Sequence, residues 1–222
     1  MAGLEIQTAP SDEPIETSEA KNFIKLDDSV DERVVRSLVI AAREWAENYT
    51  GRALINRTIK LSLDGFAEVD VPLWEGTRIG PDMTLRKRHI TLPHPPCVSV
   101  TSITTFDDSD TSTVMSSDNY YVDRARQPAQ VVLRNGANWP TALRVSNAVE
   151  IVYVAGYGTT PAEIPEAIRL AMLQYIAFSY EHRGEFERFP PPTPPASLDS
   201  LLSPYRILSL GGEPYSGTRR YY

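Results

Sequence analysis

The sequence predicts an α+β protein: a small helical bundle with an inserted, mostly antiparallel β-sheet between its two long helices, followed by an extended C-terminal tail. Two segments, near residues 30–50 and 164–183, repeat apolar residues every three or four positions, as amphipathic helices do. Between them, from about residue 58 to residue 155, short runs alternate apolar and polar residues. Turn-forming residues separate these runs, a pattern typical of antiparallel strands.

The N-terminal part predicts a mobile segment followed by a short helix. Residues 1–16 are acidic and contain prolines, so we expect them to be mobile. The helix is expected over residues 18–24. Thr17 or Ser18 is expected to cap it, because a hydroxyl oxygen can accept hydrogen bonds from the free N–H groups of a first helical turn.

The first long helix is expected over residues 30–50. Ser29 and Glu32 have the capping-box spacing, with the hydroxyl at the cap and the glutamate three residues later. Gly51 follows as a residue that permits a left-handed helix end. The helix is therefore about 20 residues, or roughly 30 Å, long. Its expected apolar stripe consists of Val34, Leu38, Ala41, Trp45 and Tyr49.

The β insertion begins near Thr58, where the apolar period shortens to two residues. Turn-rich pieces at residues 76–81, 107–113 and 135–136 separate the runs. Residues 64–83 fit either a long ordered excursion or a mobile loop. The further strand candidates are residues 85–92, 98–106, 120–123, 130–134 and 148–155.

The second long helix is expected over residues 164–183. Pro165 lies in its first turn, where a missing N–H costs no helical hydrogen bond, and Gly184 is expected to end it. A proline-rich run over residues 189–195 must then be extended. The residues expected on the buried face of this helix are Ile168, Ala171, Met172, Tyr175, Ile176 and Ser179.

A short helix over residues 197–202 and a glycine-rich, flexible tail over residues 207–222 complete the chain. We therefore expect a mobile segment over residues 1–16, one folded domain over residues 17–206, and the tail. A chain of 222 residues suits one domain and is long enough to bury a core without disulfides.

Composition argues against several classes of protein. The net charge of −7 is unlike that of a general nucleic-acid binder, which presents a basic surface. No run approaches about 18 uninterrupted apolar residues, so no membrane span is predicted, and the acidic N-terminus is unlike a signal peptide. The single cysteine, Cys97, is expected to be a buried, unreactive side chain of a protein made in the cytosol.

The histidines and the aspartate-rich turn predict structure rather than chemistry. His89, His94 and His182 show no metal-ligand spacing. His182 is expected near a helix end, where a cation is favourable. A calcium loop starting at Asp108 would lack the required glycine and glutamate, so a solvated hairpin turn is expected there.

A glycine pair follows the last strand candidate and precedes the second long helix. Gly156 and Gly158 stand where a dinucleotide-binding loop has its first two glycines, but Pro161 replaces the third. No strand follows the helix to close a βαβ unit. The glycines are therefore expected to permit a sharp strand-to-helix turn rather than to hold a phosphate.

Enzyme activity is not expected. The sequence contains no nucleophile elbow and no phosphate-binding loop, so no catalytic residue, cofactor or metal ligand is assigned. Carboxylate pairs are frequent, as in any acidic protein, and nothing selects one pair over another. An acidic-residue hydrolase, or another soluble enzyme with a β-rich active site, is the alternative function.

A series of segments in a particular order carries a resemblance. The chain resembles the head–tail connector, or adaptor, proteins of tailed bacteriophages and gene transfer agents, over about residues 15–206. The segments are SEAKNFI at 18–24, AAREWAENYTGRAL at 41–54, LPHPPCVSVTSI at 92–103, NWP at 138–140, VYVAGYG at 152–158, PEAIR at 165–169 and YEHR at 180–183.

The resemblance implies a structural role in a virion. Adaptors of this family form a ring, commonly of twelve subunits, beneath the portal at the vertex through which the genome leaves the head. The portal would lie above the ring and a tail, neck or stopper protein below it. DNA would pass through without sequence-specific binding, and an acidic lumen would not hold its phosphates. Assembly in the host cytoplasm, without catalysis or membrane contact, is also implied.

Partner-binding residues are expected among aromatic and arginine side chains, which anchor many interfaces. For Trp139 and the tyrosines, ordinary core packing is the alternative. We expect residues 207–222 to be ordered only in the assembly, where they contact a neighbour, first of all the portal; the alternative is a free end without function. The expected partner-binding residues are Trp74, Tyr215, Arg219, Arg220, Tyr221 and Tyr222.

Overall fold

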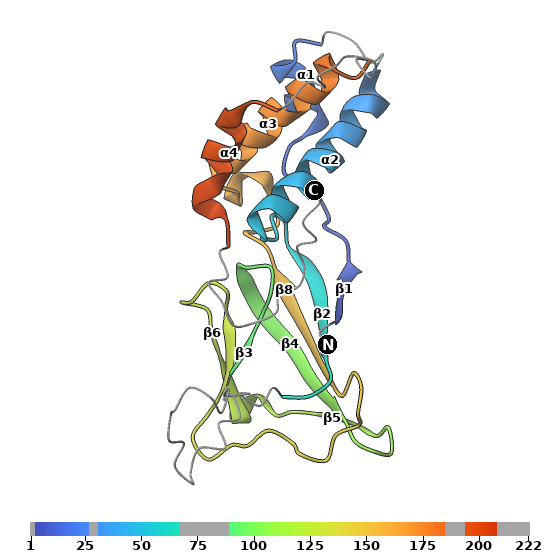
Figure 1. Cartoon of the computed structure of the whole chain (residues 1–222), viewed down its shortest axis with the longest axis vertical. Coiled ribbons are helices and arrows are strands. Elements are labelled where there is room, and N and C mark those ends of the chain that lie inside the picture. The colour runs from blue at the N-terminus through green and yellow to red at the C-terminus, as the bar shows by residue number, and fades with distance from the viewer. Residues whose placement is uncertain (1–2, 27–30, 67–88, 185–193, 208–222) are drawn as a thin grey trace, which may run out of the picture. The chain divides into compact units, whose positions relative to one another are not determined.

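A computed structural model describes residues 3–26, 31–66, 89–184 and 194–207. The chain forms two compact units (Figure 1). The β unit consists of Met1–Ala9 and Arg57–Ala155, and the helical unit consists of Pro10–Asn56 and Gly156–Tyr222. The described residues confirm the predicted α+β class, with the sheet inserted in the chain between two long helices.

Four α-helices make up the described part of the helical unit: α1 (Thr17–Phe23), α2 (Glu32–Thr50), α3 (Glu166–Glu181) and α4 (Ala196–Leu202). The long helix α2 packs against α3, α3 packs against α4, and α1 contacts both long helices (Figure 1). Their shared core contains fully buried side chains from each element, among them Ile15, Ala20, Val39, Ile168, Met172, Ile176 and Leu198.

Helix α2 buries a different stripe from the predicted one. Of the predicted stripe, Val34 is 39% exposed, and Trp45 lies at the border of the core with its ring stacked 4.7 Å from that of Tyr175. The prediction holds only in part: Leu38, Trp45 and Tyr49 pack half-buried against the core, whereas Val34 and Ala41 are exposed. The reason is that α2 carries two adjacent apolar stripes, and periodicity alone does not show which one is fully covered. The stripe in the core starts one residue later and contains two alanines: Val35, Val39, Ala42 and Ala46.

The helix ends agree with the sequence in one place and differ in two. Gly51 has a left-handed φ of 71° and its N–H donates to the carbonyl of Glu47 at 2.8 Å, as expected for a C-terminal stop. The N-cap of α2 is Asp31, whereas the predicted cap, Ser29, lies outside the described residues. The N-cap of α1 is Glu16. Both predicted caps, Thr17 and Ser18, lie inside the helix, and the Ser18 hydroxyl donates a hydrogen bond to the Glu16 carboxylate at 3.1 Å.

The β unit contains two sheets, in which every strand pair is antiparallel. The first sheet has the order β1-β2-β8-β4-β5, and the second has the order β3-β7-β6. The strands of the first sheet are β1 (Gly3–Thr8), β2 (Arg57–Leu63), β8 (Val149–Ala155), β4 (Cys97–Phe106) and β5 (Ser112–Val114). Those of the second are β3 (His89–Thr91), β7 (Gln130–Leu133) and β6 (Tyr120–Asp123).

Strand β1 corrects the prediction of a mobile segment over residues 1–16. Gly3–Thr8 pairs with β2, and Leu4 and Ile6 stand opposite Leu61 and Ile59. All six residues of β1 are exposed, so the strand lacks the buried apolar run from which a strand is usually predicted. Its order comes from backbone pairing along an existing sheet, which composition does not reveal.

The central strand β8 organises the core of the β unit. It pairs with β2 on one side and β4 on the other, and alternate residues, Val149 to Ala155, are buried. The buried Tyr153 hydroxyl donates to the Pro93 carbonyl at 2.7 Å, which satisfies the polar end of a large core side chain. The strand predicted over residues 148–155 is thus confirmed as β8.

The predicted turn over residues 107–113 is shorter than expected and leads into a strand that the sequence did not reveal. One carboxylate oxygen of Asp107 accepts hydrogen bonds from the N–H groups of Ser109 and Thr111, both at 2.9 Å. This closes the hairpin turn, and β5 begins at Ser112. Most of the uncertain excursion at 64–83 and the first half of the strand candidate at 85–92 lie outside the described residues.

Candidate functional site

The described residues end at Ile207, the first residue of the predicted tail. Tyr215, Arg219, Arg220, Tyr221, Tyr222 and Trp74 all lie outside the described residues. What the structure places is the start of the tail: the N–H of Ile207 donates to the Thr50 carbonyl at 2.9 Å, and the Arg52 guanidinium donates to the Tyr205 carbonyl at 2.6 Å. The last described residues therefore lie beside the C-terminal end of α2.

The aromatic candidates separate into core and surface. Trp139, from the β insertion, is only 3% exposed and its ring stacks 4.3 Å from that of Phe66, so core packing is the interpretation that holds. Half-buried rings instead gather on the helical unit. Trp45 stacks on Tyr175, and the Arg206 guanidinium lies 5.6 Å from the ring centre of Tyr49. A surface of Trp, Tyr and Arg side chains is typical of binding hot spots.

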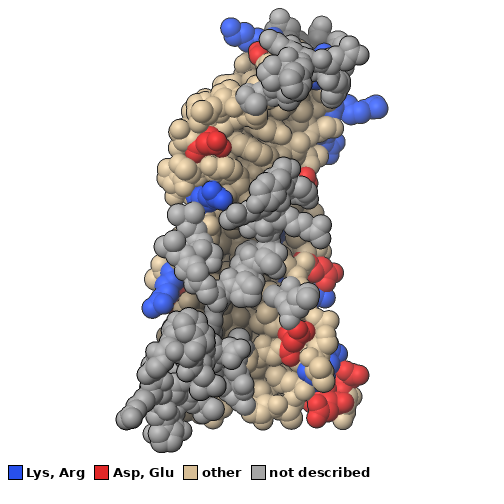
Figure 2. Space-filling view, in the orientation of Figure 1, with Lys and Arg blue, Asp and Glu red and all other residues tan. Residues whose placement is uncertain are grey.

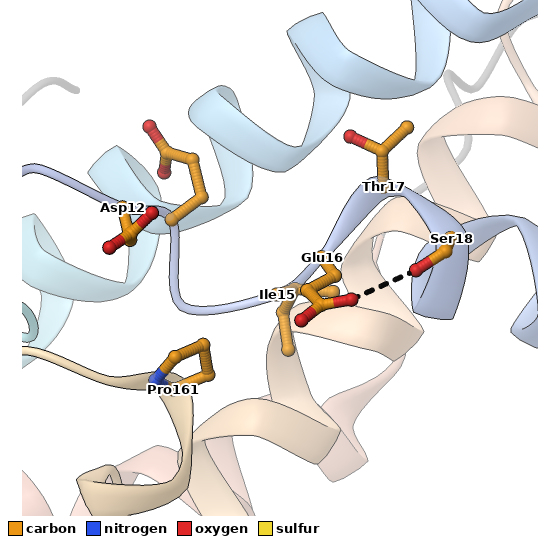
Figure 3. Close-up of a pocket in the computed structure, with 7 residues that line it drawn as sticks. Asp12, Ile15, Glu16, Thr17, Ser18 and Pro161 are labelled. Atoms are coloured by element: carbon orange, nitrogen blue, oxygen red, sulfur yellow. Dashed lines mark hydrogen bonds between the residues drawn. The ribbon is translucent and has the colours of Figure 1, made fainter.

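A hollow of about 460 Å³ opens at the start of the helical unit (Figure 3). The Glu16 carboxylate in it points at the Ser18 hydroxyl, and Glu13 accepts a hydrogen bond from the Arg43 guanidinium at 2.8 Å. The third carboxylate, that of Asp12, accepts a hydrogen bond from the Ser11 hydroxyl at 3.5 Å, so the chain itself engages all three. Among the described residues, no third group orients the serine as a nucleophile. The lining residues are Asp12, Glu13, Ile15, Glu16, Thr17, Ser18 and Pro161.

Glu13, which lines this hollow, belongs to an ionic cluster with Arg43 and Glu47. The Arg43 guanidinium lies 2.8 Å from Glu13 and 3.2 Å from Glu47, and its side chain is only 10% exposed. Burial would lower the pKa of Arg43, but attraction to Glu13 and Glu47 outweighs burial and raises it. The second carboxylate oxygen of Glu47 accepts the N–H of Leu54 at 3.1 Å. The cluster therefore joins the segment before α1 to α2 and to the segment after it, which is a structural role.

A second polar contact joins the start of α2 to the end of α3. The Asp31 carboxylate accepts hydrogen bonds from the Tyr180 hydroxyl at 2.6 Å and from the Arg183 guanidinium at 2.9 Å. These two hydrogen bonds, that of Tyr180 first, lower the pKa of Asp31 below its ordinary value of 3.8. The Arg183 guanidinium also lies 4.3 Å from the centre of the Tyr180 ring. We call these three residues the Asp31 clamp.

The space beside the glycine pair after β8 is filled by the chain itself. A Cβ on Gly156, whose φ is +149°, would overlap the backbone nitrogen of Asn56. A Cβ on Gly158 would overlap the Glu163 carboxylate, which accepts the N–H of Thr160 at 2.9 Å. That hydrogen bond lowers the pKa of Glu163. A carboxylate therefore occupies the place that a phosphate would need, and repels one.

The remaining candidates for chemistry also have structural surroundings. The His182 ring lies against Phe178, with Nδ1 at 2.8 Å from the Phe178 carbonyl. Burial raises the pKa of the half-buried Cys97 thiol, the opposite of what a reactive cysteine needs. Among the described residues, no cluster of three or more His, Cys, Asp or Glu side chains could hold a metal ion. None of the described helices has the length and apolar character needed to cross a membrane.

Charged side chains are scattered over the visible surface. On the face drawn in Figure 2, Lys and Arg side chains alternate with Asp and Glu side chains, and uncharged surface lies between them. For the described residues of this face, the charge pattern is therefore mixed rather than a single basic stripe of the kind that binds a nucleic-acid backbone.

Comparison with solved structures identifies the fold. A chain from the neck of an empty gene transfer agent (GTA) particle computed with C6 symmetry matches with a TM-score of 0.72 and 22% identity, covering 96% of this chain and 100% of that one. A chain from the neck of a native GTA particle computed with C12 symmetry matches with a TM-score of 0.62 and 24% identity, covering 96% and 100%. The chain has the fold of these neck chains.

A further match is to a chain from the structure of a whole particle. A chain from the virion of a native gene transfer agent particle has a TM-score of 0.68 and 21% identity, with 94% of this chain and 98% of that chain covered. No protein-family model and no curated protein sequence matches this sequence. The likeness therefore lies in the three-dimensional arrangement, and the neck-chain fold includes both the helical unit and the β unit.

Proposed function

We propose that the chain is a structural adaptor subunit of a phage-like particle. In this proposal, copies form a ring of twelve beneath the portal, join the DNA-filled head to the tail or neck, and let DNA pass through the ring. The protein has no catalytic activity and works at the head–tail interface of the virion after assembly in the host cytoplasm. Its function is to make contacts with its own copies, with the portal above, and with a tail, neck or stopper protein below.

The observation that carries the proposal is the mutual coverage of the fold. The neck chain with the TM-score of 0.72 is covered completely, and the match takes in 96% of this chain. A shared domain inside otherwise different proteins would leave long parts of one chain unmatched. Neck particles computed with C6 and C12 symmetry contain the matching chains, which supports a cyclic assembly for this chain as well.

The described surface also supports the proposal over the hydrolase alternative. The carboxylates with assigned contacts, Glu13, Glu47, Asp31 and Glu163, all accept hydrogen bonds that stabilise the fold. Exposed apolar side chains remain on both units, including Val34, Leu170, Val114 and Val145. Such side chains suit a protein that buries further surface when it assembles.

The ring is tested by native mass spectrometry and negative-stain electron microscopy of the purified chain, alone and with the portal protein of the same particle. We expect closed rings of one size, with twelve copies, in at least the mixture with the portal. A chain that stays monomeric in both conditions would contradict the proposal, and turnover of a substrate by that monomer would favour the hydrolase.

The tail is tested separately. A chain that ends after Ile207 keeps the two hydrogen bonds that join Ile207 to Thr50 and Tyr205 to Arg52, so it is expected to fold and to form rings. We expect it to lose binding to the portal, because the proposed anchors Arg219, Arg220, Tyr221 and Tyr222 are removed. Unchanged portal binding by the shortened chain would refute the role of the tail and leave the ring proposal intact.

A further inference from the structure

We propose that adjacent subunits of the ring join the edges of their β-sheets, with β1 of one copy pairing with β5 of the next. This inference rests on the proposed function and names the surface through which copies contact one another. The two strands are the ends of the same five-stranded sheet, β1-β2-β8-β4-β5, so among the described strands each has a partner on one side only (Figure 1).

Strand β1 has the features of an edge that is covered in the assembly. Gly3–Ile6 pairs with β2 in regular register, and the irregularity falls after Ile6. Leu4 and Ile6 share the face of Leu61 and Ile59, which are at most 3% exposed, yet they are themselves 39% and 52% exposed. The apolar face of the sheet therefore extends beyond the part that the β unit covers.

The edge of β1 is also electrically neutral. Its one charged residue, Glu5, lies 2.7 Å from the Lys60 ammonium on β2. An incoming strand would therefore meet no unpaired charge along Gly3–Ile6. Exposed edges are usually blunted by lysine, proline, a bulge or a covering segment, and none of the first three interrupts this stretch.

Strand β5 forms the other open edge. Its three residues pair with β4 without a bulge, from Thr104 opposite Val114 to Phe106 opposite Ser112. All three are exposed, and Val114 is 65% exposed. The sequence Ser-Thr-Val is uncharged. The β5 edge thus matches the Gly3–Ile6 edge in its lack of unpaired charge and in its regular register.

Two other edges of the β unit, at the first half of β4 and at β6, carry features that hinder strand addition. The first half of β4 carries register shifts between Cys97 and Ser99 and between Val100 and Ser102, and the Arg124 guanidinium donates to the Val98 carbonyl at 2.9 Å. On the second sheet, the Arg134 guanidinium donates to the Tyr120 carbonyl of β6 at 3.2 Å. Bulges and arginine side chains therefore block strand addition at these places.

A second copy of the chain is the occupant that fits both edges. Pairing of β1 with β5 joins copies head to tail, and head-to-tail interfaces repeat into a ring when the rotation closes. Pairing of β1 with β1 would instead give a two-fold dimer and leave β5 unused. Strand addition supplies main-chain hydrogen bonds, and Leu4, Ile6 and Val114 supply the apolar contacts.

Three double variants test the pairing, each adding two positive charges. Leu4→Lys/Ile6→Lys blocks the β1 edge, and Ser112→Lys/Val114→Lys blocks the β5 edge. Ala142→Lys/Val145→Lys is the control, because both residues are exposed in the loop before β8, outside any strand. Unfolding midpoints in urea and circular dichroism establish that each monomer is folded. Ring formation is then measured by native mass spectrometry and microscopy, alone and with the portal protein.

We expect each edge variant to need at least about tenfold higher concentration than the wild type to form rings, and the control to match the wild type. Mixing the two edge variants gives the sharper result. Each retains the edge that the other lacks, so the mixture is expected to form one-to-one dimers through a single intact interface and to stop there.

The outcomes separate this inference from the proposed function. Wild-type chain that forms no ring under either condition contradicts the proposed function and this inference together. Rings formed equally well by the wild type and by folded Leu4→Lys/Ile6→Lys overturn the inference alone. A mixture of the two edge variants that stays monomeric rejects the pairing of β1 with β5, and points to another protein as the occupant of the β1 edge.

Discussion

At the scale of single residues, Gly156 shows how closely two distant parts of the chain approach. Its φ of +149°, and the overlap that a Cβ would have with the Asn56 backbone nitrogen, leave no room for a side chain. Gly156→Ala is therefore expected to lower the free energy of unfolding by at least about 3 kcal/mol, through overlap and backbone strain together. Urea denaturation measures the loss.

Gly136→Ala is the matched control for this change. Gly136 also has a positive φ, of 84°, but no atom of the described residues lies within 4 Å of the position that its Cβ would take. Only the backbone strain applies there, so the expected cost is about 1–2 kcal/mol. Equal losses in the two variants would show that the contact with Asn56 does not matter.

The cluster around Arg43 gives a second prediction at this scale. Glu47 is 8% exposed and holds both the Arg43 guanidinium and the Leu54 N–H. Glu47→Ala is expected to cost about 2–4 kcal/mol, because a buried guanidinium loses a partner and a buried N–H is left without one. Glu44→Ala, in the same helix but 63% exposed and 3.8 Å from Arg43, is expected to stay within about 0.5 kcal/mol of the wild type. Chemical denaturation of both variants provides the comparison.

The sequence predicted the roles of the two glycines but not those of the buried charged residues. Gly51 and Gly156 could be read from the sequence because each follows a periodic run and only glycine readily adopts a positive φ. The buried roles of Arg43 and Glu47 could not. Both look like surface residues of a helix, and they are buried among partners such as Glu13, which is distant from them in the sequence.

At the scale of elements, the Asp31 clamp makes stability depend on pH. Hydrogen bonds from Tyr180 and Arg183 lower the pKa of Asp31 below 3.8, so the folded state favours the ionised carboxylate more than the unfolded state does. The resulting stabilisation is present above the ordinary pKa and is lost as the pH falls through the lowered one. Asp31→Asn is expected to be less stable than the wild type at neutral pH, with the difference shrinking below a pH of about 3.8.

Urea midpoints of the wild type and Asp31→Asn, taken at neutral pH and at acidic pH, test this. Asp108→Asn serves as the control, since Asp108 is exposed in the β4–β5 turn. It should leave the midpoint unchanged under both conditions. A difference between the wild type and Asp31→Asn that is the same at both pH values would rule out the clamp as its source.

The strands of the first sheet are expected to differ in local stability. Strand β8 is paired on both sides and buries alternate residues, whereas β1 is paired only with β2 in the described structure and buries none. Amide hydrogen exchange of β8 should be at least about a hundredfold slower than that of β1 in the unassembled chain. Similar protection of the two strands in the monomer would contradict this order.

Element prediction succeeded where burial leaves a pattern and failed where it does not. The apolar run in residues 148–155 identified β8, whose alternate residues are buried in the core. Strands β1 and β5 are exposed at every residue and left no such signal. In α2 the sequence shows two apolar stripes, so its pattern is ambiguous. Packing against the other helices decides which stripe is buried.

At the scale of the whole molecule, the order of segments carried more information than any single motif. Helix, β insertion and helix in this order predicted a fold that matches chains of gene transfer agent particles over 94–96% of this chain. The division into two compact units could not be predicted, because the first strand of the β unit precedes the first helix in the chain. The predicted partner-binding residues, Trp74, Tyr215 and those at positions 219–222, lie outside the described residues and stay predictions.

The overall charge gives a prediction for DNA. A chain with a net charge of −7 that lets DNA pass should not retain it. We expect purified rings to bind duplex DNA more weakly than the roughly 100 µM that marks weak non-specific binding at physiological salt. Fluorescence anisotropy with a labelled duplex measures this, with a basic DNA-binding protein as the positive control. Micromolar binding that weakens steeply with added salt would instead indicate a basic channel.

The register between Arg57 and Ala155 has a consequence for how such a chain can be built and varied. These residues face each other where β2 begins and β8 ends, and Gly156 touches Asn56 on the other side of the junction. The 99 residues from Arg57 to Ala155 are thus an insertion whose first and last residues are adjacent. A short glycine linker from Asn56 to Gly156 could replace this insertion without stretching the chain, and an inserted sheet of another size would need no change in the positions of Asn56 and Gly156.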